Sequence, residues 1–462
     1  MTEPNPEPKT ARVSEDWLAA GVGAALLLVC LAAVLLSGGE NPLAPYLATP
    51  GKWSQSPGEG LEGKLLGMLG AGVAVLVGYG AAIVVGGSSL RRFLPGFFAV
   101  FALATLAMVL SKQQVVAYWG LNYVLWAIVL GLLVSNTVGA PDWMRPALRP
   151  ELFTKVGLVL LGAELLIGKL LAFGPSGVLI AWVVTPIVLV STYWFGQKVL
   201  RIESPSLNMV VSADMSVCGV SAAIATAAAT RAKKEELSLA ISLSAAFTVA
   251  MMVLLPIVVK ATGLPPAIGG AWIGGTIDST GAVGAAGALL SSEADDTALI
   301  AATTIKMIQN VLIGVIAFGV AVYWVSVVEP KQQQETQPQA TDEPRPRPEL
   351  MEIWRRFPKF ILGFFGASLL ASALFEYHPQ GPEVVESLVR GSTKTLRTWC
   401  FAIAFTAIGL ETHFRTLAGT LRGGKPLVLY VCGQSLNLLL TLLMSWLTLG
   451  VLFPGAADAI AK

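Results

Sequence analysis

Long apolar runs separated by short polar segments are the feature that most restricts the fold of this chain. Each run is close to the ~20 residues that a helix needs to cross a bilayer. Lipid offers no hydrogen-bond partners, so the backbone of such a run must satisfy its own polar groups, which favours helices. With 54% hydrophobic and 13% charged residues, the 462-residue chain does not fit a soluble domain. We therefore expect an all-α membrane protein with about 11 transmembrane helices, over residues 17–37, 65–85, 93–110, 121–138, 153–173, 178–196, 237–259, 297–327, 360–375, 396–410 and 427–452.

The positions of the polar segments divide the chain into four predicted parts. Residues 1–16 form a polar tail, and residues 17–327 form a first transmembrane block. Residues 328–356 are rich in Gln, Pro, Thr and Glu, which is typical of a disordered connector, here a cytoplasmic one. Residues 357–462 supply the last helices. The first apolar run has no clear cleavage site, so we expect an uncleaved helix and not a signal peptide.

Two predicted segments, residues 207–230 and 266–290, combine an acid with hydroxyls and glycines inside otherwise apolar or small-residue runs. The acids are Asp214 and Asp278. Ionisable groups at membrane depth are expensive and usually functional. Glycine and small polar residues let a membrane helix break and expose backbone groups to a ligand. Two such broken segments predict the two halves of a transport site.

Clusters of Lys and Arg between the helices indicate the orientation, because cytoplasmic loops are enriched in them. All but one of these clusters fit a cytoplasmic N-terminus. The basic cluster at residues 231–234 conflicts with this orientation if residues 207–230 cross the membrane fully. The conflict disappears if both broken segments are re-entrant hairpins that enter from opposite faces, as in an inverted repeat. The alternative is 13 segments, two of them unwound at mid-membrane.

The two acids have two interpretations. A carboxylate beside unwound carbonyls and hydroxyls can bind Na⁺, and a buried carboxyl group can exchange a proton. The alternative is that Asp214 and Asp278 only cap the helices that follow them. A helix N-terminus at each break would draw an anion, because its N–H groups are free and its dipole end is positive. The predicted substrate contacts at the breaks are Ser216, Cys218, Gly219, Ser221, Ser279 and Thr280.

Lys306 lies near the predicted middle of its helix, and Gln309 and Asn310 share its face at i+3 and i+4. These three side chains could bind an anion, or Lys306 could neutralise an acid in a structural ion pair. Glu164 is predicted to lie at a similar depth in the membrane. It could be the charge partner of Lys306 or a proton carrier. Asn136 is a further substrate candidate, although a helix-end role is the stronger interpretation. Three polar residues of the last helix are expected to form hydrogen bonds between helices: Gln434, Ser435 and Asn437.

The sequence lacks a nucleotide-binding loop, a His-containing metal motif and a nucleophile elbow, so we expect neither an enzyme nor a cofactor other than Na⁺. A formal net charge of +2 gives no reason to expect a nucleic-acid partner. The expected partners are a small anion and the lipid bilayer.

Five short motifs taken together resemble one family. They are SVCGVSA at 216–222, AKKEE at 232–236, TIKM at 304–307, GLET at 409–412 and GGKPL at 423–427. The chain is similar to the YeiH-like sulfate exporters of bacteria from about residue 121 to its end, as a divergent member. Asp278 stands where that family has His, and Asp214 stands where it often has Gly or Thr. The resemblance implies inverted-repeat transporters that commonly work as dimers, so we expect a homodimer.

The leading hypothesis is a secondary active transporter in the bacterial inner membrane that moves a small anion, such as sulfate or sulfite, with H⁺ or Na⁺ by alternating access. A second hypothesis is a cation–proton antiporter in which Asp214 and Asp278 are the exchanging acids. A third is a membrane sensor or scaffold that transports nothing.

Overall fold

The computed structural model describes residues 13–118, 121–292, 295–329, 351, 354, 357–413 and 424–461. Most of the predicted connector at 328–356 and of the predicted tail at 1–16 lies outside this range. The described chain is helical, without a β-strand, and divides into two compact units. The first unit is residues 1–169 and 359–413, and the second is residues 170–358 and 414–462. The predicted all-α class is confirmed.

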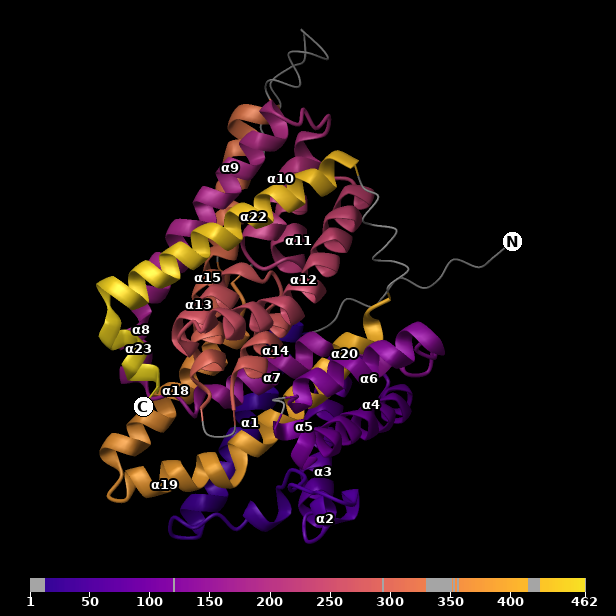
Figure 1. The fold of residues 1–462 in the computed structure, drawn as a ribbon, viewed down its shortest axis with the longest axis vertical. Coiled ribbons are helices and arrows are strands. Elements are labelled where there is room, and N and C mark those ends of the chain that lie inside the picture. The colour runs from indigo at the N-terminus through magenta and orange to yellow at the C-terminus, as the bar shows by residue number, and fades with distance from the viewer. Residues whose placement is uncertain are drawn as a thin grey trace. The chain divides into compact units, whose positions relative to one another are not determined.

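The first unit contains short helices and long apolar ones (Figure 1). They are α1 (Glu15–Leu36), η1 (Ala44–Tyr46), α2 (Pro57–Leu61), α3 (Leu65–Val85), α4 (Leu90–Ser111), α5 (Gln114–Tyr118), α6 (Tyr123–Thr137), η2 (Arg145–Ala147), α7 (Pro150–Gly162), α18 (Phe360–Tyr377), α19 (Gly381–Leu388), the π-helical η5 (Val389–Thr393) and α20 (Lys394–Glu411).

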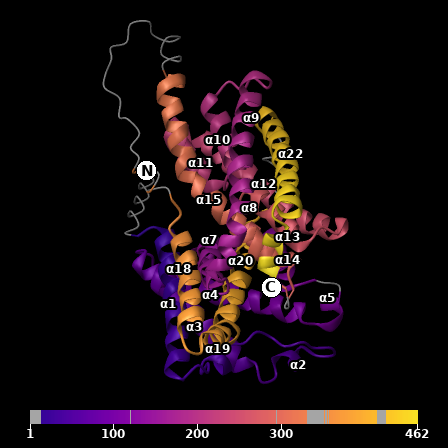
Figure 2. The same cartoon turned by 90° about the vertical axis from the view of Figure 1, so that its left-hand side faces the viewer.

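The second unit holds both segments that the sequence predicts to be broken. Its helices are α8 (Ile167–Val178), the π-helical η3 (Leu179–Val183), α9 (Val184–Lys198), α10 (Pro205–Ser216), α11 (Val220–Thr230), α12 (Lys234–Thr262), α13 (Pro266–Thr276), α14 (Thr280–Leu290), α15 (Thr297–Tyr323), η4 (Trp324–Val328), α22 (Gly424–Trp446), η6 (Leu447–Leu452) and α23 (Pro454–Ala461). Within this unit α22 lies along α9 in both views (Figures 1 and 2).

Eight helices of the described chain are long and apolar enough to cross a membrane. They correspond to eight of the eleven predicted spans, and the full count stays a prediction. Predicted span 121–138 is the 15-residue helix α6. Predicted span 396–410 lies in α20, which carries Lys394, Arg397 and Glu411.

The predicted helix over 153–173 is wrong in its boundaries, because the chain breaks after Gly162 and α8 then continues into α9. A Cβ atom at Gly162 would collide with the carbonyl oxygen of Phe364, so α18 packs directly against the end of α7. The freed backbone groups are satisfied by α18: the Ser372 hydroxyl accepts from the Ile167 N–H at 2.7 Å, and Ser368 donates to the Leu165 carbonyl.

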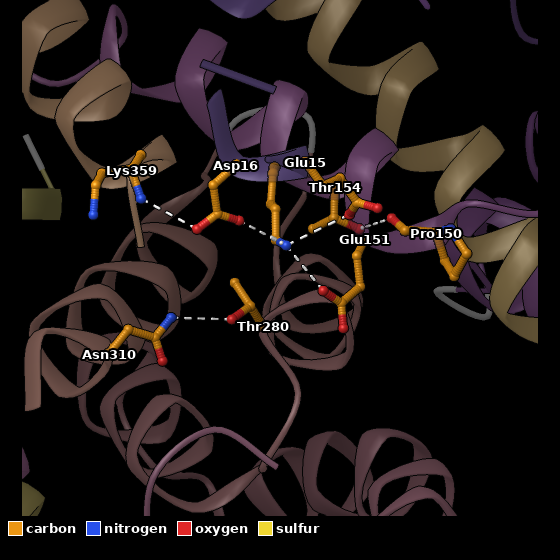
Figure 3. A network of polar contacts seen from close by, with 9 residues as sticks. Glu15, Asp16, Pro150, Glu151, Thr154, Thr280, Asn310 and Lys359 are labelled. Atoms are coloured by element: carbon orange, nitrogen blue, oxygen red, sulfur yellow. Dashed lines mark hydrogen bonds and ion pairs between the residues drawn. The ribbon is translucent and has the colours of Figure 1, made fainter. Parts of the chain in front are cut away.

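In the first unit, charges link α1 to α7 and α18 (Figure 3). The Lys155 ammonium lies 3.0 Å from the Asp16 carboxylate, 2.9 Å from Glu151 and 3.5 Å from Glu15. Asp16 also accepts from the Lys359 N–H at 3.1 Å. Glu15 and Asp16 therefore belong to the start of α1, two residues and one residue before the predicted first span, and Glu151 belongs to the start of α7.

Packing around α15 predicts that alanine substitution lowers the free energy of unfolding at one glycine and raises it at another. A Cβ atom at Gly274 would collide with the Ala302 carbonyl oxygen, whereas a Cβ atom at Gly319 would meet open space. We expect Gly274→Ala to lower the free energy of unfolding by about 2 kcal/mol through overpacking. Gly319→Ala should raise it by about 0.5 kcal/mol, because alanine loses less entropy in a helix. Unfolding by added denaturing detergent measures both, and equal effects at the two sites would contradict the packing.

Candidate functional site

The first broken segment folds back on itself as a hairpin of α10 and α11. The Glu236 carboxylate, at the start of α12, accepts from the hydroxyls of Ser204 at 2.5 Å and Ser206 at 2.8 Å, at the start of α10. Glu236 also follows the end of α11 by six residues. A continuous helix from 205 to 230 would separate its two ends by roughly 40 Å. Both ends of the segment therefore lie together.

The second broken segment, α13 and α14, also folds back. Gly270 lies in α13 before the break and Gly287 lies in α14 after it. A Cβ atom at Gly270 would collide with the Ala298 carbonyl oxygen, and one at Gly287 would lie 2.9 Å from Leu299 Cα and 3.4 Å from the same carbonyl. Both helices thus pack against the same turn of α15.

The two hairpins lie along helix α15 and start from its opposite ends. Its first turns pack against α13 and α14, and its last turns lead to Glu329, which pairs with Arg231 at the end of α11 at 3.5 Å. The tips meet between these ends: a Cβ atom at Gly219 would lie 3.4 Å from both Cβ and O of Asp278. Each segment is therefore a hairpin and not an unwound span, and entry from opposite faces of a membrane stays a prediction. The predicted inverted repeat stays a prediction.

At the first tip, Gly219 has the backbone angle φ of +58°, which favours glycine because other residues pay a steric cost there. The Gly219 N–H closes the end of α10 on the Asp214 carbonyl at 2.9 Å, and the Gly219 carbonyl accepts from the Ala223 N–H at 2.9 Å to start α11. One glycine therefore ends one half-helix and begins the next.

The carbonyl groups at the ends of α10 and α13 are satisfied by polar side chains of α15. Lys306 donates to the Val217 carbonyl and to Gln309 Oε1, each at 2.6 Å. The Gln309 amide donates to the carbonyls of Ser216 at 3.1 Å and Gly275 at 3.3 Å. Lys306 also acts electrostatically on Asp278. Lys306 and Gln309 thus bind the negative ends of both half-helices, a role that the sequence interpretation of Lys306 as an anion ligand or an ion-pair partner did not include.

Helix α22 supplies a second set of amide donors. Gln434 donates to the Thr276 carbonyl at 2.9 Å, and Asn437 donates to the carbonyls of Met215 at 3.3 Å and Thr276 at 3.4 Å. Asn437 accepts from the Thr441 hydroxyl at 2.9 Å. The expected hydrogen bonds between helices are confirmed for Gln434 and Asn437, and they connect α22 to both hairpins, whereas Ser435 is exposed.

Tyr430 is a site residue that the sequence interpretation missed. Its hydroxyl donates to Asp278 Oδ2, and its ring stacks on Phe247 with centroids 4.6 Å apart. Tyr430 precedes Gln434 by four residues and Asn437 by seven, so all three lie on one face of α22. This spacing of polar residues in an apolar helix is the sequence signal that could have identified Tyr430.

Both acids of the hairpins are buried, Asp214 at 0% and Asp278 at 1% exposure. Asp214 lies in the last turn of α10, and Asp278 lies in the break before α14. Within the described chain, no hydrogen bond of ordinary geometry reaches either carboxylate oxygen of Asp214, although the Ser244 hydroxyl is adjacent. The two acids are close enough to interact electrostatically. A buried carboxylate without a donor is costly unless a proton or a cation accompanies it.

The helix-capping interpretation of the two acids is wrong. The N-cap residues are Gly219 for α11 and Ser279 for α14, and neither makes a side-chain capping bond. Asp214 stands at the C-terminal end of its helix, where an acid opposes the helix dipole. Asp278 accepts a hydrogen bond from the Tyr430 hydroxyl and caps no helix. The acids therefore need another explanation than helix stability.

The predicted hydroxyl contacts differ in exposure. Ser216 is buried and donates to the Ser212 carbonyl at 2.8 Å, and Cys218 is also buried. Ser279 and Thr280 are half-buried, and Thr280 accepts from the Asn310 amide at 3.1 Å (Figure 3). Ser221 is exposed. The structure thus brings Thr280 and Asn310 together at the second tip.

Two predicted site residues belong to the first unit instead. Asn136 donates to the carbonyls of Leu132 at 2.9 Å and Thr412 at 3.0 Å, which fits the helix-end role. Glu164 pairs with Arg397 at 2.9 Å, and both side chains are nearly buried. Arg397, and not Lys306, is therefore the charge partner that the structure gives Glu164.

Removing the arginine of this pair should be strongly destabilising. Arg397→Met leaves Glu164 buried without its partner, so we expect a loss of about 3 kcal/mol in the free energy of unfolding. The double variant with Glu164→Gln should lose less than Arg397→Met alone, because no buried charge is left. Detergent-induced unfolding of the four proteins of this cycle measures the difference, and additive losses would contradict a coupled pair.

In the described chain no three His, Cys, Asp or Glu side chains are grouped as metal ligands. Beside the Ser244 hydroxyl, the two carboxylate oxygens of Asp214 accept no hydrogen bond of ordinary geometry within the described residues, and such hard oxygens are of the kind that bind Na⁺ or a proton. Na⁺ binding at Asp214 and Asp278 therefore stays a prediction.

Comparison with known proteins identifies relatives but no structural template. No solved structure matches the chain. A UPF0324 membrane protein of Rhodopirellula baltica is 56% identical over 421 residues, covering 91% of this chain and 74% of the relative. One of Nitratidesulfovibrio vulgaris is 52% identical over 371 residues, covering 80% and 61%. A third, of Nitrosomonas europaea, is 32% identical and covers 67% and 65%. The chain thus spans about three fifths of the length of the Nitratidesulfovibrio relative.

These relatives confirm the family resemblance read from the motifs, and their names describe membrane proteins without a substrate. The family described as conserved hypothetical protein 698 matches residues 95–430, a stretch that includes both hairpins and the start of α22. The chain belongs to this family of membrane proteins.

Proposed function

We propose that the protein is a secondary active transporter that moves a small anion across the bacterial inner membrane, coupled to H⁺ or Na⁺. One observation carries the proposal: two opposed hairpins place buried Asp214 and Asp278 at their tips, beside a buried Lys306. Irregular backbone at membrane depth is tolerated where it lines a binding site, and opposed broken helices are typical of secondary transporters.

The balance of charge supports coupling to a cation. Lys306 offsets one of the two acids, so a site with both acids ionised carries one uncompensated negative charge. Burying that charge is unfavourable, and a bound proton or Na⁺ removes the cost. An anion would meet a repulsive site before this cation binds and a neutral one afterwards. Anion and cation should therefore bind together.

The half-helices supply the anion contact. Helices α11 and α14 both begin at the meeting tips, and neither cap residue, Gly219 or Ser279, makes a side-chain bond to the first N–H groups. Such N-termini attract anions. Thr280, held by Asn310, adds a hydroxyl group at the second tip. The substrate class that fits is a small inorganic anion such as sulfate, sulfite or bicarbonate.

Purified protein in liposomes tests the proposal. Labelled sulfate, sulfite and bicarbonate are followed separately under an imposed H⁺ gradient and an imposed Na⁺ gradient. Accumulation of one anion that follows one gradient supports the proposal and names the coupling ion. No anion accumulation under either gradient would contradict it.

A cation–proton antiporter is the second candidate. The hydrogen bonds that the Lys306 ammonium group already makes favour it. Two of the three ammonium hydrogens are already directed at Val217 and Gln309, so little of the charge is free for an anion. In that case Asp214 and Asp278 exchange H⁺ for a cation. Na⁺-dependent loss of a pH gradient without any anion would establish this function.

A further inference from the structure

A basic cavity lies in the first unit, where α3 turns into α4. Its volume is about 470 Å³, and its lining includes Arg92, Arg149, Ser88, Ser89, Phe93 and Ile83. We call it the arginine cavity. Small-molecule sites in proteins commonly have volumes of this order.

The local sequence builds this cavity through a tight turn. Gly87 has φ of +79°, and the N–H groups of Gly87 and Ser88 close the end of α3 on the carbonyls of Val84 at 3.0 Å and Ile83 at 2.9 Å. This is the usual glycine-terminated helix end. Ser89 then starts α4 as its N-cap without a side-chain capping bond. The N-terminus of α4 therefore opens directly at the turn.

The short helix η2 brings the second arginine to the same place. It packs against α4 at Gly96, where a Cβ atom would lie 2.8 Å from Ala147 Cβ and 2.9 Å from the Met144 carbonyl. Arg149 follows η2 and donates to the Ser88 hydroxyl at 3.2 Å. Arg149 and Arg92 thus line one cavity although they come from different segments.

The charge of the arginine cavity is unbalanced. No acid lines it, and within the described chain neither Arg92 nor Arg149 forms an ion pair. The nearby Arg145, by contrast, pairs with Asp142 at 3.0 Å. Two guanidinium groups, two serine hydroxyls and a helix N-terminus are all donors that suit a phosphate group.

We propose that the arginine cavity binds the phosphate headgroup of an anionic phospholipid. Phe93 and Ile83 add an apolar part to the lining, which suits the glycerol and upper acyl region beside the phosphate. The cavity also lies between the ends of α3 and α4, both long and apolar enough to span a membrane, and so at headgroup level. Basic pockets of this kind at the ends of membrane helices bind anionic headgroups.

Native mass spectrometry of the purified protein with phosphatidylglycerol or phosphatidylcholine tests the assignment. We expect the wild-type protein to retain phosphatidylglycerol preferentially. Arg92→Gln with Arg149→Gln should lower this affinity by about tenfold or more, because each basic residue near the headgroups contributes to binding. Arg145→Gln is the matched control, since it removes a charge from the same region outside the lining and should retain the lipid.

Three results would overturn the assignment. They are equal retention of the two lipids, retention of phosphatidylglycerol by the double glutamine variant, and inorganic phosphate binding as tightly as the lipid. Arg92→Lys with Arg149→Lys keeps both charges and should preserve most of the preference. If the double glutamine variant does not fold, each single glutamine variant gives the same comparison.

Discussion

Asp278→Asn should abolish gradient-driven accumulation of the substrate while the protein still folds. The substitution is nearly isosteric, and the asparagine carbonyl can still accept from the Tyr430 hydroxyl. It removes the charge that the coupling ion needs at the second hairpin tip. We expect accumulation in liposomes to fall by at least about tenfold, the equivalent of about 1.4 kcal/mol in binding of the coupling ion.

The matched control is Asp142→Asn, an exposed acid in the first unit whose side chain is 89% accessible. It should transport as the wild type does. Asp214→Asn should behave like Asp278→Asn, because the two acids share one uncompensated charge. If the Asp278→Asn variant accumulates substrate as the wild type does, and still needs the imposed gradient, then Asp278 has no part in coupling.

Lys306→Met should have the largest effect on stability. It deprives the Val217 carbonyl and Gln309 Oε1 of their donor and leaves Asp278 without the nearby positive charge. Breaking a buried charge arrangement by removing one member costs about 3 kcal/mol or more. The measurement is detergent-induced unfolding of the purified protein.

Two further variants separate the electrostatic part of this loss from a general effect of the substitution. Lys260→Met, at an exposed position near the end of α12, should change stability by no more than about 0.5 kcal/mol. Adding Asp278→Asn to Lys306→Met should restore about 1 kcal/mol, because the unbalanced acid is gone. A double variant no more stable than Lys306→Met alone would show that Lys306 does not offset Asp278.

The helices and the breaks could be predicted because they depend on local composition. Apolar length predicted the span 65–85 to the residue, as α3. An acid with hydroxyls and glycine inside a run of small residues located both breaks. The basic cluster at 231–234 led to the opposed hairpins, because charged loops restrict which side of a membrane a segment can end on. These signals lie within a few residues of the features that they predict.

The contacts of the site could not be predicted, because they join residues far apart in the chain. Nothing near Glu164 in the sequence indicates that its partner is Arg397. The role of Lys306 at the Val217 carbonyl depends on how the first hairpin meets α15. Tyr430 reaches Asp278 from a helix that begins more than a hundred residues later. Only its position on the face of Gln434 and Asn437 offered a signal, and that signal is equally typical of structural hydrogen bonds.

The central claim is that the acids at the hairpin tips couple the movement of an anion to that of a cation. Coupled binding is reciprocal, so a gradient of the substrate alone should move the coupling ion. The most direct measurement loads liposomes with the transported anion, without any H⁺ or Na⁺ gradient, and records both ions as the anion leaves. We predict that H⁺ or Na⁺ leaves with the anion in the wild type and that neither moves in Asp278→Asn. Anion efflux from the wild type with no movement of either ion would contradict the claim.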